Sequence, residues 1–451
     1  MSTFTSTRGS DPVPSSEAVL RGLAPDGGLY VPVEIPVLPP ISFEAPTGEG
    51  SDETVRGQVV RVAHWAAPVL FPDVPGATVA RVVERALTFP IPLVEVEPGR
   101  FVLELFHGPT HAFKDVGARF MAALMVELGV GETRSRTILV ATSGDTGGAV
   151  ADAFHGLEGY RVVVLFPREG VSVRQRRQMT TLGGNVHALA VRGTFDDCQR
   201  MVKDAFLDTS LGERYGLTSA NSINIARLLP QTLYFAYAAI CVARRVADRG
   251  GGVDADSVRP RFVVPSGNLG NLCAGLLAQR AGMASSGFIA ASNTNRAFVD
   301  FLAGDGYEPR PSISTASNAM DVGAPSNLER ILWLYDDDAG ALRRDVVGVS
   351  VTDDQTTRCI AEVYERTGYV LDPHSAVAFA ASKRHDVASD KPAVILATAH
   401  PAKFPEIVEA AIGREIPLPP GLARTPSKSE HMHEIEATLP ALSIELEALP
   451  T

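Results

Sequence analysis

The amino-acid sequence predicts an α/β protein with two domains of mainly parallel sheet and a smaller N-terminal region. From about residue 99, short runs of β-branched residues alternate with helical patterns. This alternation is typical of parallel strands that are covered by helices on both faces. The chain has 451 residues, of which 45% are hydrophobic. That length exceeds the size at which a single hydrophobic core usually stops growing, so more than one domain is expected.

Six apolar runs are predicted to be strands, and they fall into two groups. They are TILVAT (137–142), YRVVVLFP (160–167), NVHALAV (185–191), RFVVP (261–265), GFIAAS (287–292) and AVILAT (393–398). A more helical stretch separates the first three from the last three, which predicts one sheet for each group. Ligands are then expected in the crevice at the carboxyl ends of the strands.

The same pattern suggests where the domains begin and end. Before residue 98, two segments have helical patterns, and beyond about residue 414 the chain is expected to be loosely ordered. We predict an N-terminal region at 1–98, a larger α/β domain at 99–131 and 230–415, a smaller nested α/β domain at 132–229, and a C-terminal tail at 416–451.

Charge and composition exclude several classes of partner. The net charge of −11 does not favour nucleic acid or an anionic membrane surface, because both call for clustered lysine and arginine. No apolar run approaches the roughly 20 residues that span a bilayer. The cysteines are widely separated and form no CxxC pair; they are Cys198, Cys241, Cys273 and Cys359. We therefore expect no zinc site, no disulfide framework and a cytoplasmic location.

A single lysine stands out in the stretch FHGPTHAFKD (106–115). If a helix covers residues 112–129, the face that carries Lys114 is otherwise apolar and has no carboxylate; its other members are Gly117, Ala118, Met121, Ala122 and Met125. A lysine in such surroundings tends to lose its proton, and the neutral amine attacks carbonyl groups. Alternatively, Lys114 extends to solvent from the first turn of the helix.

The two histidines beside this lysine do not predict a metal site. His107 and His111 have HxxxH spacing, but Gly108 and Pro109 lie between them. The two side chains are therefore not expected on one helical face, and the glutamate of the zinc motif is missing.

Three polar segments follow predicted strands or precede predicted helices. TSGDTGGAV and VPSGNLGNL are glycine-rich turns whose backbone N–H groups can hold an anion, although neither matches a dinucleotide or ATP motif. In SANSINIARLLPQ (219–231), Arg227 could bind a phosphate or carboxylate. Equally, this third segment could be a helix cap followed by a solvated arginine.

Together these segments resemble threonine synthases, which are pyridoxal-phosphate enzymes of the tryptophan-synthase-β-like fold, also called fold type II. The resemblance is carried by LFHGPTHAFKDVGARF, TSGDTGGAV, TLGGNV, NSINIARLLPQ, VPSGNLGNL, SNAMDV and TAHPAKF, and it extends to about residue 415. The chain departs from the family at Leu269, Asn271 and His111. The first two changes leave a backbone cradle possible, whereas His111 changes the shape of the pocket.

The resemblance implies a role for each residue that would bind the cofactor. Lys114 would bind pyridoxal phosphate covalently and act as the catalytic base. Thr398 would face the pyridine nitrogen, and Asp145 would lie near the phenolic oxygen. The phosphate would be held by the loop of Gly267, Asn268, Leu269, Gly270 and Asn271.

The resemblance also implies the substrate and the reaction. Ser143, Gly144 and Thr146 would bind the substrate's carboxylate. Ser222, Asn224 and Arg227 would bind the phosphate of O-phosphohomoserine. The expected products are threonine and phosphate, formed by a monomer or homodimer. A phospho-lyase or dehydratase of the same fold, and a protein that binds the cofactor without catalysis, remain as alternatives.

Overall fold

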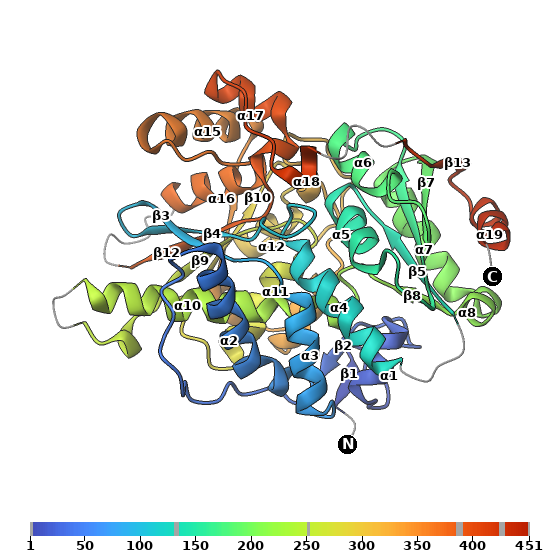
Figure 1. The fold of residues 1–451 in the computed structure, drawn as a ribbon, viewed down its shortest axis with the longest axis horizontal. Helices are drawn as coiled ribbons and strands as arrows, with labels where there is room; N and C mark the ends of the chain where they lie inside the picture. Colours follow the sequence, from blue (N-terminus) through green and yellow to red (C-terminus); the bar gives the residue numbers. More distant parts are fainter. Residues whose placement is uncertain (1–2, 130–134, 250–252, 385–390, 424–428, 450–451) are drawn as a thin grey trace.

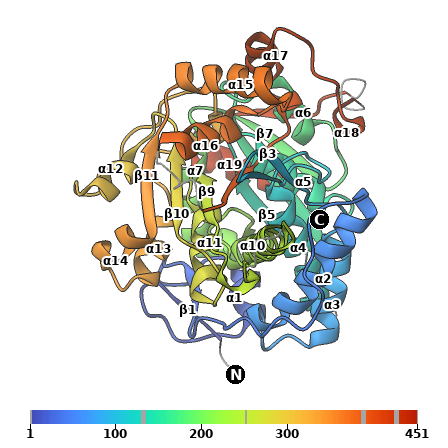
Figure 2. The same cartoon turned by 90° about the vertical axis from the view of Figure 1, so that its left-hand side faces the viewer.

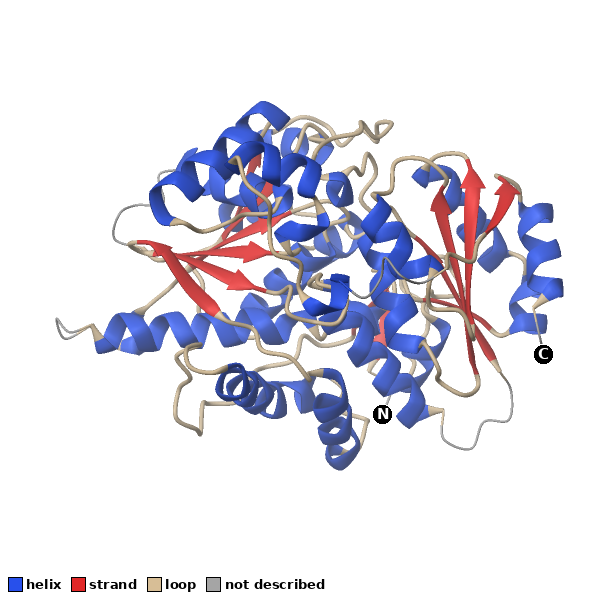
Figure 3. Ribbon diagram, turned by 45° about the horizontal axis from the view of Figure 1, so that its top comes forward, coloured by secondary structure: helices blue, strands red, loops and turns tan. Residues whose placement is uncertain are grey.

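The computed structural model describes residues 3–129, 135–249, 253–384, 391–423 and 429–449. Over these residues the chain forms two large sheets of mostly parallel strands and a two-stranded antiparallel sheet, β1 (Phe4–Ser6) with β2 (Tyr30–Pro32) (Figure 1). Helices lie between the two large sheets and outside them (Figure 3). This arrangement confirms the predicted fold class. The predicted domain boundaries stay predictions, and the one between residues 131 and 132 lies outside the described residues.

The six-stranded sheet has the order β11-β10-β9-β12-β4-β3. Its strands are β3 (Leu93–Glu97), β4 (Arg100–Glu104), β9 (Arg261–Pro265), β10 (Phe288–Ser292), β11 (Val346–Ser350) and β12 (Ala393–Ala397). All neighbours are parallel except β3, which returns antiparallel along β4. Because β12 lies between β4 and β9, segments far apart in the sequence end side by side at one edge of this sheet.

The five-stranded sheet has the order β13-β7-β6-β5-β8, and all its neighbours are parallel. Its strands are β5 (Arg136–Ala141), β6 (Tyr160–Pro167), β7 (Val186–Arg192), β8 (Leu217–Ser219) and β13 (His433–Glu436). The six strands expected from the sequence all lie within one residue of their predicted bounds. Apolar runs bounded by glycine and polar turns therefore located the central strands well.

The helices form layers on these sheets. Those of the N-terminal region are α1 (Ser15–Arg21), α2 (Asp52–Leu70) and α3 (Gly76–Ala86). Those beside the five-stranded sheet are α4 (Lys114–Leu128), α5 (Asp145–Phe154), α6 (Val173–Thr180), α7 (Phe195–Leu207), α8 (Thr209–Tyr215) and α19 (Leu439–Ala448). The others are α9 (Ile225–Leu228), α10 (Gln231–Asp248), α11 (Gly270–Arg280), α12 (Ala297–Ala303), α13 (Leu328–Leu334), α14 (Ala339–Asp345), α15 (Asp353–Thr367), α16 (Pro373–Arg384), α17 (Pro405–Ile412) and α18 (Pro420–Ala423). Short 3₁₀ turns are η1 (Ala255–Ser257), η2 (Asn318–Met320) and η3 (Pro401–Lys403).

Alternate residues of each strand face different hydrophobic cores. In β9, Phe262 and Val264 belong to the central core, whereas Val263 belongs to the core under α15, α16 and α17. In β5, Ile138 lies in the central core and Leu139 lies in the core that contacts α7. Because neighbouring side chains of a strand point to opposite faces, a strand that is buried on both faces reads as a continuous apolar run.

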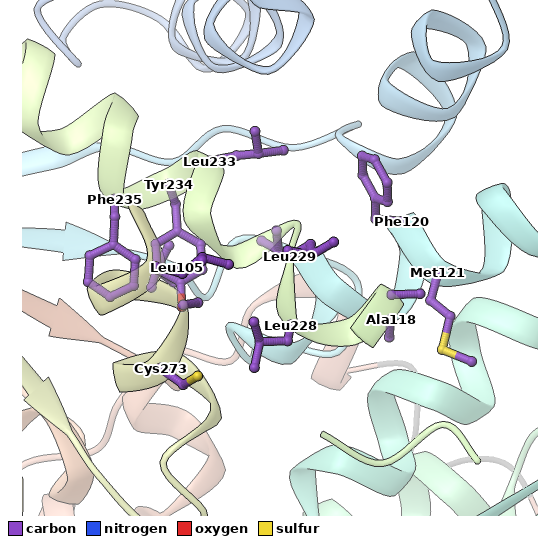
Figure 4. Packing of buried hydrophobic residues seen from close by; sticks show 14 of the residues in the cluster. Leu105, Ala118, Phe120, Met121, Leu228, Leu229, Leu233, Tyr234, Phe235 and Cys273 are labelled. Carbon is purple, nitrogen blue, oxygen red and sulfur yellow. The ribbon is translucent and has the colours of Figure 1, made fainter. Parts of the chain in front are cut away.

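The central core joins the two sheets through α4, α9 and α10. Leu228, Leu229 and Leu233 lie between the residues that α4 contributes, such as Met121, and Phe235 on the other side (Figure 4). Helix α10 runs through the middle of the protein and is seen nearly end-on in Figure 2. Among the described residues, the helical stretch Ile225–Asp248 is long and apolar enough to cross a membrane, but its most apolar window of 18 residues is buried inside the protein. Its composition is explained by this central position.

The prediction that the C-terminal tail is loosely ordered is wrong for residues 433–448. Strand β13 pairs with β7 and extends the five-stranded sheet, and α19 covers α7. Three apolar side chains of residues 433–448 are buried, namely Ile435, Leu442 and Leu446. Glu430 lies 2.9 Å from nitrogens of both Arg176 and Arg177 of α6. The prediction failed because the prolines and polar residues of 416–432 are typical of a loop, and the strand and helix begin only after them.

A pair of substitutions in α19 tests this packing. Leu442 is fully buried, whereas Ile444 two residues later is 65% exposed. Leu442→Ala should destabilise the protein by about 2–5 kcal/mol, because it leaves a cavity in a packed core. Ile444→Ala should change stability by less than about 0.5 kcal/mol. Thermal and urea unfolding of both variants would measure this, and equal effects would contradict the packing of α19.

Candidate active site

One pocket lies where strands of both sheets end. Residues that directly follow β5, β8, β9 and β12 line it, together with the first residue of α4. Twelve of the residues predicted for the site line this pocket: Lys114, Ser143, Asp145, Thr146, Ser222, Arg227, Gly267, Asn268, Leu269, Gly270, Asn271 and Thr398. The carboxyl ends of parallel strands in an open α/β sheet are the usual place for a ligand.

Gly144 and Asn224 are not among the residues that line the pocket. Asn224 is fully buried, and its side-chain oxygen accepts a hydrogen bond from the N–H of Ala226 at the start of α9. Its amide donates to the backbone oxygens of Val19 and Ser219. The asparagine therefore acts as a helix cap, which was the alternative that capping preferences allowed.

Lys114 begins α4 beneath the pocket. Its neighbours along the helix face are buried as expected from the sequence. The lysine side chain is only 15% exposed, and its Nζ lies 3.9 Å from Oδ2 of Asp145. That carboxylate belongs to α5, so an inspection of the residues of α4 alone could not find it. Burial lowers the pKa of Lys114 to about 8, although Asp145 opposes this shift.

The loop Gly267–Asn271 forms a cradle at the start of α11. Leu269 has a left-handed backbone with φ of 60°, and the helix begins at the next residue. A left-handed residue before a helix turns successive N–H groups toward one side, where they can hold an anion. At Gly267, a Cβ atom would lie 2.8 Å from the Cα of Met320, so only glycine fits this position.

Thr398 is tied to the segment that carries Lys114. The backbone oxygen of Thr398 accepts a hydrogen bond of 2.9 Å from the N–H of Phe113, and Ala399 forms a β-bridge with Ala112. The end of β12 and the start of α4 are therefore held in fixed register. An amine of low pKa, an anion cradle and a hydroxyl group meet in one pocket. This set of groups fits a phosphorylated aldehyde such as pyridoxal phosphate.

A second group of polar side chains lies next to the cradle. Ser222 accepts hydrogen bonds from the side-chain amides of Asn268 and Asn327, at 2.9 and 3.0 Å. Arg227 is 3% exposed and donates one hydrogen bond to the backbone oxygen of Ala220. Its Nε has no hydrogen-bond partner in the described part of the chain. Burial lowers the pKa of Arg227 to about 10, which still leaves the guanidinium charged at neutral pH.

Several other residues of the pocket were missed in the sequence. They are Phe113, Ala141, Phe195, Gln199, Asn221, Gln231, Pro265, Ala319, Met320, Val322 and His374. His374 is the second residue of α16, where its Nδ1 lies 2.7 Å from Oδ1 of Asp372 and its Nε2 accepts a hydrogen bond from the N–H of Ala319. Seven of the missed residues lie in motifs that the sequence singled out, but without a role of their own: Phe113, Asn221, Gln231, Pro265, Ala319, Met320 and Val322. Phe195, Gln199 and His374 reach the pocket from segments outside those motifs.

His107 and His111 lie apart from this pocket. His107 bonds to Glu104 through Nε2 at 2.7 Å, and His111 contacts the ring of His400 at a centroid distance of 5.7 Å. Among the residues that the structure describes, no group of three or more His, Cys, Asp or Glu side chains is arranged to hold a metal ion.

Three family models match the chain. The model described as pyridoxal-phosphate dependent enzyme matches residues 89–399, and those for the threonine synthase N terminus and C-terminal part match residues 3–48 and 375–443. Threonine synthase from Haemophilus influenzae is 41% identical over 407 residues, which cover 90% of this chain and 89% of that protein. The chain belongs to the threonine synthase family. Threonine synthase from Escherichia coli (strain K12) is 38% identical over 435 residues, 96% of each chain.

Solved structures agree with this assignment. The crystal structure of threonine synthase from Escherichia coli superimposes with a TM-score of 0.86 at 35% identity, over 99% of this chain and 100% of that one. The pyridoxal-phosphate-bound threonine synthase from Brucella melitensis has a TM-score of 0.85 at 36% identity, over 99% of each chain. These matches confirm pyridoxal phosphate as the cofactor and threonine synthesis as the activity. A threonine deaminase from Solanum lycopersicum shares only the fold, with a TM-score of 0.51 at 16% identity.

The cradle predicts the effect of one small substitution. Gly267→Ala should weaken the binding of pyridoxal phosphate at least about tenfold, because the added methyl group overlaps the backbone of Met320 and displaces the loop. Gly57→Ala is the matched control, since nothing lies within 4 Å of the position of its Cβ. Titration of the cofactor-free chain with pyridoxal phosphate would measure both affinities. An unchanged affinity for Gly267→Ala would remove this loop from the cofactor site.

Proposed function

We propose that this enzyme converts O-phospho-L-homoserine and water into L-threonine and phosphate. The observation that carries this choice of substrate is the buried guanidinium of Arg227 beside the lysine pocket. Among the described residues, Arg227 forms no salt bridge within 4 Å, and the carboxyl of Asp115 acts on it only from a longer distance. A buried cation without a counter-ion is costly, and an anionic ligand would supply the missing charge.

The residues around Arg227 suit a phosphate group in particular. Ser222 and Asn221 also line this end of the pocket, next to the first turn of α9. The phosphate of the substrate is a dianion, which requires both a positive charge and several hydrogen-bond donors. Asn224, which was expected to contribute, is used as a helix cap, and Arg227 and Ser222 carry the proposal.

Bound pyridoxal phosphate would supply an electron sink that stabilises negative charge at the substrate's Cα. We assign its covalent attachment to Lys114, its phosphate to the loop Gly267–Asn271, and its ring nitrogen to the hydroxyl of Thr398. A neutral hydroxyl there withdraws fewer electrons than a carboxylate would. That property suits a reaction in which Cβ and Cγ also react.

The proton transfers fall to Lys114 in this proposal. Its low pKa lets the free amine act as a base at neutral pH. Lys114 takes the protons from Cα and Cβ of the substrate and returns protons at Cγ and Cα. Arg227 and Ser222 hold the phosphate as it leaves Cγ, and a water molecule adds its hydroxyl group to Cβ. Ser143 and Thr146 orient the substrate through its carboxylate.

Two further features of the proposal concern the enzyme in the cell. We infer that it acts in the cytoplasm as a monomer or homodimer. All four cysteines are buried and unpaired, which suits a reducing compartment. The pocket is lined by residues of one chain, so a monomer can provide every group that the proposal uses.

Product analysis tests the proposed reaction. The cofactor-loaded enzyme should convert O-phosphohomoserine into threonine and phosphate in equal amounts. Lys114→Ala should lower the rate by at least about 10³-fold, because this variant lacks both the covalent attachment and the base. Formation of 2-ketobutyrate instead of threonine would move the enzyme to the eliminases of this fold.

A second substitution tests the phosphate site. Arg227→Ala should raise KM for the phosphorylated substrate about 10- to 100-fold, because a charge-assisted hydrogen bond contributes about 1.5–3 kcal/mol. The affinity for pyridoxal phosphate should change less than about twofold. Arg214→Ala on the surface is the control, since the side chain of Arg214 is 62% exposed. Steady-state kinetics give these values, and an unchanged KM would exclude Arg227 from the site.

A further inference from the structure

A second lysine lies next to the pocket, and neither the sequence nor the proposed reaction assigns it a role. Lys403 ends the short turn η3 after β12, and its side chain is fully buried. Its Nζ lies 2.6 Å from Oδ1 of Asp145 and donates a hydrogen bond of 3.0 Å to the backbone oxygen of Thr110. Lysine is almost never fully buried unless it is paired, so this ion pair accounts for its position.

The two carboxylate oxygens of Asp145 have different surroundings. Its Oδ1 accepts hydrogen bonds from Lys403 and from the side-chain amide of Gln175, which is 2.9 Å away. Its Oδ2 faces Nζ of Lys114 at 3.9 Å. The carboxylate therefore forms a close ion pair with Lys403 and a longer one with the lysine that lines the pocket.

This arrangement determines the charge around Lys114. Lys403 and Lys114 hold the pKa of Asp145 well below its usual range despite complete burial. The carboxylate is thus ionised, but Lys403 already balances its charge. If Asp145 had Lys114 as its only counter-ion, the pair would favour a protonated Lys114. A protonated amine neither attacks an aldehyde nor removes a proton.

We propose that Lys403 is a positioning residue that fixes and neutralises Asp145, so that Lys114 is released to act as a nucleophile and base. Lys403 does not line the pocket itself; it acts on Lys114 through the carboxylate of Asp145 and through its own positive charge. Lys403 belongs to the segment TAHPAKF (398–404), which directly follows strand β12 and begins with Thr398. The inference rests on the proposed role of Lys114.

None of the other charged or titratable groups described near Lys114 pairs with Asp145 as closely as Lys403 does. Arg227 of α9 also lowers the pKa of Lys114. The carboxylate of Asp115 accepts hydrogen bonds from the backbone N–H and the hydroxyl of Thr110. Nδ1 of His374 in α16 is hydrogen-bonded to Oδ1 of Asp372. Besides each other, the charged groups that act on Lys114 and Asp145 are, by element, Arg227 (α9), His374 (α16) and Lys403 (η3).

The test removes the charge of Lys403 and measures the titration of Lys114. In full-length chain freed of cofactor, an amine-reactive reagent labels Lys114 as a function of pH, and peptide mass spectrometry follows that lysine. In Lys403→Met the midpoint of labelling should rise by about one pH unit, because a like charge is lost and an opposite charge is exposed. Lys203→Met, at an exposed lysine, should leave the midpoint unchanged.

The cofactor-loaded enzyme gives a second measurement. The acid side of the pH profile of kcat, which reports the substrate complex in which Lys114 is free to act as a base, should move to higher pH by the same amount in Lys403→Met, so that activity below the midpoint falls about tenfold. The double variant with Asp145→Asn removes both charges, and its midpoint should return toward that of the unmodified enzyme. A midpoint that stays in place in Lys403→Met would show that Lys403 has only a structural role.

The design remains decisive if Lys403→Met does not fold, because a buried carboxylate without its partner is destabilising. The same comparison is then made in the Asp145→Asn background, where adding Lys403→Met should still raise the midpoint of Lys114, and an unchanged midpoint would overturn the inference. Reduction of the loaded enzyme with borohydride, followed by peptide mapping, separately shows whether the cofactor is attached to Lys114. Attachment elsewhere would overturn the role of Lys114, whatever Lys403 does.

Discussion

The site depends on one constraint, which is that strands of two separate sheets end at the same place. In a parallel sheet every strand delivers its following residue to one edge. Here the edge of the six-stranded sheet supplies the loop Gly267–Asn271 and Thr398, and the edge of the five-stranded sheet supplies Ser143 and Ser222. A cofactor and a substrate can therefore be contacted from opposite sides. The shared core of α4, α9 and α10 holds these two edges together.

Burial at this junction accounts for the chemistry of the charged side chains. Four charged side chains here have little or no access to water, namely Lys114, Asp145, Lys403 and Arg227. In water their pKa values would be ordinary, and their mutual interactions would be weak. In the interior, the one carboxylate and its two lysines must be considered as a unit. The guanidinium of Arg227 has no salt bridge to the described residues there, and in the proposed function an anionic ligand supplies its counter-charge.

The C-terminal segment contributes to both large sheets and their helical layers. After β12 completes the larger sheet and α17 packs against α15, residues 429–449 cross to the other sheet and add β13 and α19. Glu430 contacts α6, which also carries Gln175, the partner of Asp145. The tail is thus joined to a helix that contributes to the site. Its two last elements also close the core that contains Leu139 and Leu165.

The sequence by itself predicted the fold class and the main strands, and its resemblance to threonine synthases pointed to Lys114, the loop Gly267–Asn271 and Thr398 as site residues. These features are local: an apolar run, a glycine turn or a lysine among apolar residues carries its meaning within about ten positions. The tertiary structure alone decided which distant groups meet. It brought Asp145 and Lys403 to Lys114, left Arg227 unpaired, and used Asn224 as a cap instead of a ligand. Contacts between separate elements depend on packing and on the order of strands in a sheet. Neither of these can be predicted from the spacing of residues along the chain.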